Sequence, residues 1–179
     1  RGLGDVYKRQ VEIEAADVPF GIGSGSGVIF GVTGGVTEAV LRRLQQGHNR
    51  VDMESIKKSG VRGDDGIKVL TYNYNGREIK AAVVNGLANA DKVLQQIKNH
   101  EAEYDFVEVM ACRRGCIMGG GQPVNAGPRT RKARMKGLYD TDVNTQIKKS
   151  NENPMILSLY DTLLKGKEHE LLHRNFSGK

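Results

Sequence analysis

The two cysteines of this chain lie three residues apart in a glycine-rich segment, and this segment restricts the possible folds more than any other. It runs from Glu108 to Pro123 and places Cys112 and Cys116 before three consecutive glycines. Two thiolates at this spacing converge on one centre if the backbone turns helically. The glycines let the backbone approach a bulky group, and their N–H groups can hydrogen-bond to metal ligands. The segment therefore predicts a loop wrapped around an inorganic cluster.

Three interpretations of the cysteine pair stay open on the residues alone. The first is a redox pair, although the usual dithiol motif has two intervening residues and a thioredoxin-like context. The second is a copper site that uses Met110 or Met118 as a further ligand. The third, which we rank first, is an iron-sulfur site. Such clusters usually take four cysteine ligands, so we expect the other ligands to lie outside this chain.

Length and composition predict one domain of ordinary size. The chain has 179 residues with 38% hydrophobic content, which is enough to bury a core. No run of about 18 apolar residues occurs, so no membrane span is expected. Two cysteines in a chain this long do not form a secreted disulfide framework, and we expect a reducing, cytoplasmic setting.

The first ten residues have no apolar core of a signal peptide and resemble a translated sequencing adaptor. We interpret residues 1–10 as a non-native artefact and residues 11–179 as the natural part, so the true N-terminus is expected to be missing. The artefact contributes +2 of the formal net charge of +6. Without these residues the formal net charge is +4, which is modest.

A cluster of cations lies between residues 129 and 136, at Arg129, Arg131, Lys132, Arg134 and Lys136. No aromatic residues interleave with these charges, so a solvated helix face is favoured and nucleic-acid binding is not expected. Ala133 and Met135 indicate that this helix is partly buried.

The apolar pattern predicts an α/β fold with a small mixed sheet flanked by helices. Strands at 67–74 and 77–84 are joined by Asn75-Gly76, a strong hairpin signal. A third strand at 106–110 leads directly into the cysteine loop. Chemistry in α/β folds usually lies at such a C-terminal strand end.

Helices are predicted at 34–46, 88–99, 129–136, 142–149, 154–165 and 168–173. For the first helix, Thr33 is the expected N-cap and Gly47 the stop, with Arg42 and Arg43 facing away from the core. The second is expected to point Ala90, Val93, Leu94 and Ile97 inward. Gly137 is expected to end the third.

Two further motifs are weaker. Residues 21–27 have glycine at every second position, which matches neither the dinucleotide fingerprint nor a phosphate loop, and predicts a flexible loop. His169 and His173 have a spacing that can bind zinc, but no third ligand is evident, so their roles stay undetermined. His48 and His100 are isolated.

Residues 108–123 resemble the third signature motif of iron-only (iron-iron) hydrogenases, in which two cysteines precede a triple glycine, Gln and Pro. Residues 25–39 resemble the glycine-rich segment of that family. The stretch ending at Tyr139, then Asn153-Pro154 and residues 169–173, are similar to the family's C-terminal end. The resemblance covers about residues 15–175.

This resemblance implies the C-terminal part of the large-subunit catalytic domain of an enzyme that reversibly reduces protons to dihydrogen. Its cofactor is a four-iron four-sulfur cluster bridged to a di-iron subcluster carrying carbon monoxide and cyanide. Cys112 is implied to be a cluster ligand and Cys116 the bridging ligand. Met110 is implied to pack beside the di-iron unit, and Phe30 with Gly31 to line its pocket.

The resemblance has departures and further implications. Arg113-Arg114 and Thr37 differ from the usual residues, which indicates a divergent subgroup. The family's other two cysteine motifs precede this region, so the isolated chain is expected to be an inactive fragment. Implied partners are an electron donor or acceptor, such as ferredoxin or NAD(P)H-linked subunits, and maturation proteins. The alternative is a hydrogenase-like iron-sulfur assembly or sensory protein.

Overall fold

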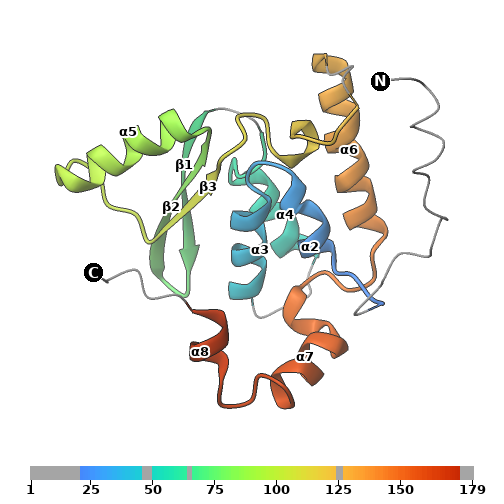
Figure 1. Ribbon diagram of the computed structural model, residues 1–179. Helices are drawn as coiled ribbons and strands as arrows, with labels where there is room; N and C mark the ends of the chain where they lie inside the picture. The colour runs from blue at the N-terminus through green and yellow to red at the C-terminus, as the bar shows by residue number, and fades with distance from the viewer. Residues whose placement is uncertain (1–20, 46–49, 64–65, 124–126, 174–179) are drawn as a thin grey trace, which may run out of the picture.

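A three-stranded sheet lies at the centre of the computed structural model, which describes residues 21–45, 50–63, 66–123 and 127–173 (Figure 1). Strand β1 (Ile67–Tyr74) pairs antiparallel with β2 (Arg77–Asn85), and β2 pairs parallel with β3 (Phe106–Met110). Asn75 and Gly76 both have positive φ, as a two-residue hairpin turn requires. The predicted mixed sheet and hairpin are confirmed. The proposed artefact at residues 1–10, Gly47 and His48 lie outside the described ranges.

The second half of β2, residues 81–85, is buried on both faces because helices cover both sides of the sheet. Helices α3 (Gly35–Leu44) and α4 (Arg50–Lys58) cover one face, with a core of Leu41, Ile56, Val61, Leu70, Ala81 and Val83. Helix α5 (Leu87–Lys98) covers the other, with Ala82, Val84, Ala90 and Val93. Alternate residues of β2 thus enter the two cores. Sequence patterning did not predict α4.

Helix α5 is buried only along its first half. Ala90 and Val93 pack on the sheet as predicted, but Leu94 is 52% exposed and Ile97 is 36% exposed. The prediction that Leu94 and Ile97 point inward is therefore wrong. The narrow sheet ends before the helix does, so the second half of α5 extends past the strands (Figure 1).

The second half of the glycine-serine segment is helical, whereas residues 21–24 are not in a helix or strand. Ser24 caps α2 (Gly25–Val28) by accepting a hydrogen bond from the Gly27 N–H, and the 3₁₀ helix η1 (Ile29–Gly31) follows. The N-cap of α3 is Gly34, at φ +89°, and not Thr33 as predicted. The segment is ordered because it packs between α3 and the C-terminal part of the chain.

Helix α6 (Pro128–Asn144) continues through Gly137 and replaces two predicted elements. The predicted stop at Gly137 and the predicted helix at 142–149 are both wrong. A glycine within a helix costs only about 1 kcal/mol. Packing of Leu138 and Tyr139 against the core of Ile29, Val32 and Ile117 offsets that cost.

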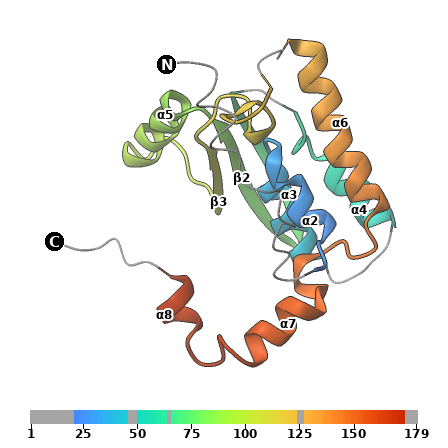
Figure 2. The ribbon, with the colours of Figure 1, turned by 45° about the vertical axis from the view of Figure 1, so that its right-hand side comes forward.

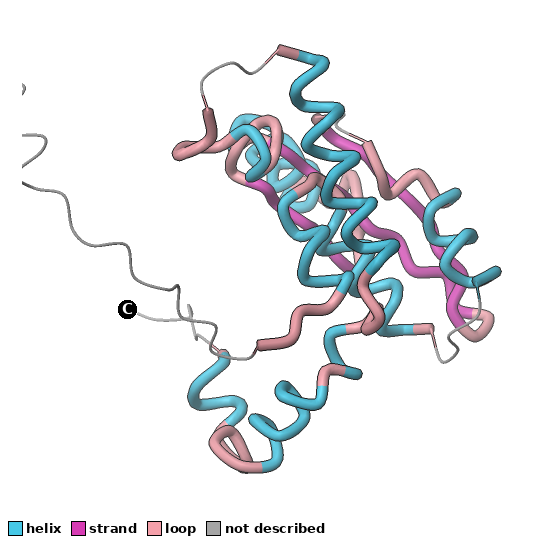
Figure 3. The backbone as a smooth tube through the Cα atoms, turned by 90° about the vertical axis from the view of Figure 1, so that its right-hand side faces the viewer, coloured by secondary structure: helices cyan, strands magenta, loops and turns pink. Residues whose placement is uncertain are grey.

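The chain ends in short helices that extend away from the sheet as an arm (Figure 2). These are the 3₁₀ helix η3 (Ser150–Glu152), α7 (Pro154–Asp161) and α8 (Glu168–Leu172). Helix α7 is shorter than the predicted 154–165. Figure 3 shows this arm set apart from the strands and the helices packed against them. Within the described ranges, no helix is both long and apolar enough to cross a membrane.

Candidate iron-sulfur site

The two cysteines lie directly after the C-terminal end of β3, as predicted. Cys112 follows the strand by two residues, and Cys116 begins the 3₁₀ helix η2 (Cys116–Met118). The Gly115 N–H donates to the Cys112 carbonyl at 3.1 Å, and the Gly119 N–H donates to the Cys116 carbonyl at 3.1 Å. Both thiols are free and exposed. The two cysteines are therefore joined by a hydrogen-bonded turn that ends at Gly115, rather than by a continuous helical turn, and the 3₁₀ helix begins only at Cys116.

The glycines after Cys116 leave space around the thiols. A Cβ atom at Gly119 would lie 3.8 Å from the Cys112 Sγ, so this sulfur lies beside the loop that follows Cys116. At Gly120 and Gly121, a Cβ atom would meet no described atom within 4 Å. The loop can accept a bulky group next to two thiolates, and this donor set suits one part of an iron-sulfur site.

Met110 and Gly31 both lie against Gly115. The Met110 sulfur accepts a hydrogen bond from the Thr33 hydroxyl at 3.6 Å, and both side chains are buried. A Cβ atom at Gly115 would lie 3.2 Å from this sulfur and 3.1 Å from the Gly31 carbonyl oxygen. Gly115, at φ +76°, thus allows the cysteine turn to pack closely on Met110 and Gly31.

Glu108, a buried carboxylate on β3, fastens the strand to the start of α3. Its Oε1 accepts from the Gly34 N–H at 2.8 Å, and its Oε2 accepts from the Thr37 N–H and hydroxyl, both at 2.7 Å. The carboxylate therefore satisfies donors at the positive end of the helix. Sequence reasoning missed this role, although a lone acid within an apolar strand was a usable signal.

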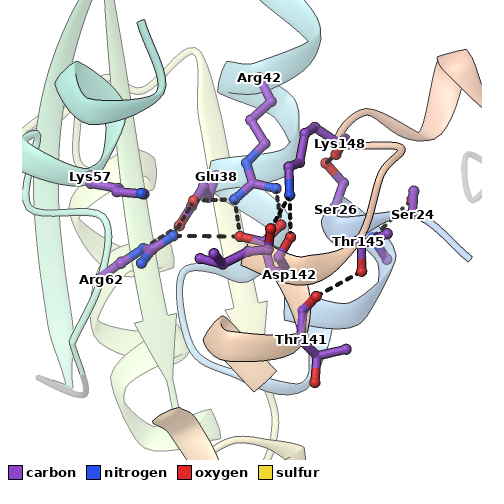
Figure 4. A network of polar contacts seen from close by, with 12 residues as sticks. Ser24, Ser26, Glu38, Arg42, Lys57, Arg62, Thr141, Asp142, Thr145 and Lys148 are labelled. Carbon is purple, nitrogen blue, oxygen red and sulfur yellow. Dashed lines mark hydrogen bonds and ion pairs between the residues drawn. The ribbon is translucent and has the colours of Figure 1, made fainter. Parts of the chain in front are cut away.

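A buried ion cluster joins α3 to α6 (Figure 4). Arg42 is fully buried, and its guanidinium binds Asp142 through both nitrogens at 2.8 Å and Glu38 at 2.6 Å. Burial by itself lowers the pKa of Arg42, but the carboxylates of Asp142 and Glu38 outweigh it and raise the pKa above its ordinary value. The prediction that Arg42 faces away from the core is wrong, because its partners lie inside.

Arg62 closes the other side of this cluster. Its Nε and Nη2 donate to the two oxygens of Glu38 at 2.8 and 2.7 Å, and its guanidinium lies 3.9 Å from the centre of the Tyr139 ring. The cluster thus connects the segment before β1 with α3 and α6. Sequence reasoning missed it because Arg62 and Asp142 are far in the chain from Glu38 and Arg42.

Phe30 lies apart from the other predicted site residues. Its side chain is 45% exposed and lines a groove between α3 and α7 that also contains Val36, Val40, Ile156 and Tyr160. The structure brings Cys112, Cys116, Met110 and Gly31 together around Gly115. The pocket-lining role of Phe30 stays a prediction.

The histidines give no third ligand. The rings of His169 and His173 lie 4.8 Å apart between centroids on α8. Among the residues that the structure describes, no group of three or more His, Cys, Asp or Glu side chains is arranged to bind a metal ion. The described residues thus offer two free thiols, those of Cys112 and Cys116, as candidate metal ligands.

The fold and the site define a mixed α/β domain that presents two thiolates at the end of a strand. A family model described as the C-terminal domain of the iron-only hydrogenase large subunit matches residues 5–120. A second, described as the iron hydrogenase small subunit, matches residues 128–179. The chain belongs to the iron-only hydrogenase family.

Relatives and solved structures agree with this assignment. Iron hydrogenase 1 of Clostridium pasteurianum is 37% identical over an alignment 174 positions long, which covers 92% of this chain and 30% of that protein. The NADP-reducing hydrogenase subunit HndD of Solidesulfovibrio fructosivorans is 38% identical over 91% of this chain and 28% of its own length. A structure of a variant of the FeFe-hydrogenase HydA1 from Chlamydomonas reinhardtii matches with a TM-score of 0.58 and 32% identity, over 97% of this chain and 53% of that one. The chain thus spans under a third of these relatives and about half of the solved structure.

Proposed function

We propose that residues 11–179 form the C-terminal part of a hydrogenase catalytic domain that reversibly reduces protons to dihydrogen. The observation that carries this proposal is the turn from Cys112 to Cys116, which holds two free, exposed thiols beside an open glycine loop. Family membership supports the same function.

The cofactor in this proposal is a four-iron four-sulfur cluster bridged to a di-iron subcluster with carbon monoxide and cyanide ligands, and it supplies the redox-active iron at which protons and electrons combine. When this group is bound, Cys112 would hold its four-iron part, and Cys116 would supply the thiolate ligand that the four-iron and di-iron parts share. Met110 contributes a buried thioether beside the cysteine turn, which limits the access of water. Thr33 holds that thioether in place through its hydroxyl.

This chain contributes only part of such a site. A four-iron cluster usually takes four cysteine ligands, and two are available here. The matching part of the chain spans 30% and 28% of the two hydrogenase relatives, so these relatives are about three times as long as this chain. We propose that the other ligands belong to a protein of similar length. The isolated 179-residue chain is accordingly expected to be inactive.

Redox partners are part of the proposal as well. Two relatives are named as an NADP-reducing hydrogenase subunit and a periplasmic Fe hydrogenase large subunit, the latter 43% identical over 111 residues. By analogy, ferredoxin or an NAD(P)H-linked subunit would exchange electrons with this protein, and maturation proteins would deliver the di-iron unit. The cytoplasmic location stays a prediction.

A second candidate function is iron-sulfur assembly without hydrogen turnover. A probable cytosolic Fe-S cluster assembly factor of Aedes aegypti is 25% identical over 98% of this chain and 38% of its own length. The higher identity to hydrogenases, together with the buried Met110 beside the cysteine turn, favours the enzyme. A sensory role with the same cofactor is a further alternative.

The test uses the protein extended upstream to full length and matured with its cofactor. We expect hydrogen evolution and infrared bands of metal-bound carbon monoxide and cyanide. Cys116→Ser should abolish both, whereas Glu101→Gln, at an exposed position after α5, should leave both unchanged. Full activity in Cys116→Ser would contradict the bridging role. Absence of the infrared bands from the wild-type protein would favour assembly.

A further inference from the structure

The side chain of Arg134, on α6, reaches the cysteine loop. Its Nη1 donates to the Ile117 carbonyl at 2.8 Å, and its Nη2 donates to the Pro123 carbonyl at 3.1 Å. The same Nη1 lies 3.8 Å from the Met118 sulfur. Arg134 is half-buried, whereas Arg129, Lys132 and Lys136 are exposed. One guanidinium therefore bridges both ends of the loop that contains the three glycines.

Apart from the bonds from Arg134, the backbone of the glycine loop makes only short-range hydrogen bonds within the described residues, such as that from the Gly119 N–H to the Cys116 carbonyl at 3.1 Å, and Ile117 anchors the start of the loop in the core. Glycine loses more conformational freedom on folding than any other residue, so three in a row make an ordered loop costly. Side chains at Gly120 and Gly121 would meet no described atom within 4 Å. The Gln122 N–H donates to the Gly119 carbonyl at a long 3.3 Å. A planar guanidinium with several donors can satisfy two separate carbonyls at once, which an ammonium group does less well.

The two partners of this contact belong to regions that different family models match. The loop residue Ile117 lies in the region of the large-subunit model, and Arg134 lies in the region of the small-subunit model. The small-subunit region of this chain therefore contributes a side chain to the loop that follows Cys116. The contact is specific, because it depends on one arginine and two backbone carbonyls.

We propose that Arg134 is a positioning residue for the cluster-binding loop. Its guanidinium closes the Ile117–Pro123 loop and thereby holds the adjacent Cys116 in its helical turn. The importance of this turn for a cofactor rests on the proposed function. Closure of the loop does not, so it can be tested on the 179-residue chain without any cofactor.

The first test is backbone amide hydrogen exchange on the full chain. Arg134→Gln should speed exchange at Gly119 and Gln122 by about tenfold, equivalent to the loss of one net hydrogen bond of about 1.4 kcal/mol. Arg134→Lys keeps the positive charge but loses the planar guanidinium that can donate to two carbonyls at once. Its exchange rates should therefore lie between those of Arg134→Gln and those of the wild type. Lys132→Gln, at an exposed position on the same helix, should match the wild type.

Unchanged amide exchange on β2 and α5 would show that Arg134→Gln is folded. Faster exchange confined to the loop then supports the proposal. Wild-type exchange at Gly119 and Gln122 in folded Arg134→Gln would overturn it. This measurement involves no metal, so its result can be interpreted even if the hydrogenase proposal is wrong.

The second test uses the matured, full-length protein and its infrared spectrum. If Arg134 positions Cys116, Arg134→Gln should shift or broaden the carbon monoxide bands, and Lys132→Gln should not. Bands identical to those of the wild type in Arg134→Gln would show that the loop contact does not reach the cofactor, and would overturn the positioning role.

Discussion

Arg42 on α3 and Asp142 on α6 form a buried bidentate ion pair, although 100 residues separate them in the chain. Both nitrogen–oxygen distances are 2.8 Å. The pair joins the region matched by the large-subunit model to the region matched by the small-subunit model. A buried ion pair is weak as a source of net stability, but removal of one partner leaves the other charge uncompensated. The pair therefore enforces one arrangement of α3 and α6.

We expect Asp142→Ala to lower the free energy of unfolding by about 3–5 kcal/mol, because it leaves the guanidinium of Arg42 buried without its main partner. Urea unfolding followed by circular dichroism measures this loss. Asp140→Ala is the matched control, since Asp140 pairs with Lys136 on the surface. Its loss should be under about 1 kcal/mol. Equal losses in the two variants would mean that the ion pair is not buried in solution.

Gly25→Ala should also destabilise the protein, because α2 approaches Asp142 too closely for a side chain. A Cβ atom at Gly25 would lie 2.1 Å from the Asp142 Oδ1, whereas a Cβ atom at Gly27 would lie 3.5 Å from the Ser24 Oγ. We expect a loss of about 1–3 kcal/mol for Gly25→Ala. Gly27→Ala involves only ordinary contact and should be neutral or slightly stabilising. The opposite order of the two unfolding midpoints would refute the close approach.

Glu108→Gln keeps the size of the side chain but removes its charge and one acceptor oxygen. Three hydrogen bonds from Gly34 and Thr37 end on this carboxylate, so an amide would direct an N–H group at a donor. We expect a loss of about 1.5–3 kcal/mol in unfolding free energy. Glu78→Gln, at an exposed position on β2, should change it by less than about 0.5 kcal/mol. A neutral Glu108→Gln would rule out the capping role.

Tyr139 should make the stability of the protein fall at high pH. Burial raises the pKa of Tyr139 to about 12, above the ordinary value of 10.0. The folded state thus keeps the phenol proton that the unfolded state releases, so stability is fully present below about pH 10 and is lost as pH rises toward 12. Tyr139→Phe should therefore lose less stability than the wild type as pH rises. The free energy of unfolding, measured between pH 9 and 11.5, checks this expectation.

The same substitution tests the environment of the hydroxyl. Among the described residues, the Tyr139 hydroxyl is buried without a hydrogen-bond partner. Tyr139→Phe should therefore be neutral or slightly stabilising at pH 7. Tyr160→Phe, at a position that is 44% exposed, is the control for removal of an exposed phenol hydroxyl at pH 7. A Tyr139→Phe protein that follows the pH dependence of the wild type would contradict the raised pKa.

Local patterns in the sequence predicted those parts of the fold that neighbouring residues decide. Alternating apolar residues and Asn75-Gly76 predicted the β1–β2 hairpin, because both the strand period and the turn type are local properties. The strand at 106–110 and the cysteines after it were predicted for the same reason. Residues 108–123 also indicated the family, because the spacing of their two cysteines and the three glycines that follow is specific to it.

Long-range packing decided the rest. Nothing near Arg42 indicates that it is buried, because Asp142 reaches it only when α6 folds against α3, and Arg62 reaches its partner Glu38 only when the segment before β1 does so. Helix α6 passes Gly137 because tertiary contacts of Leu138 and Tyr139 outweigh a local propensity of about 1 kcal/mol. The sequence by itself determined which two thiolates this chain offers. Only the tertiary structure decided that Glu108 binds the start of α3, that Thr33 contacts Met110 and that Arg134 contacts the loop after Cys116, because each of these contacts joins segments that are distant in the chain.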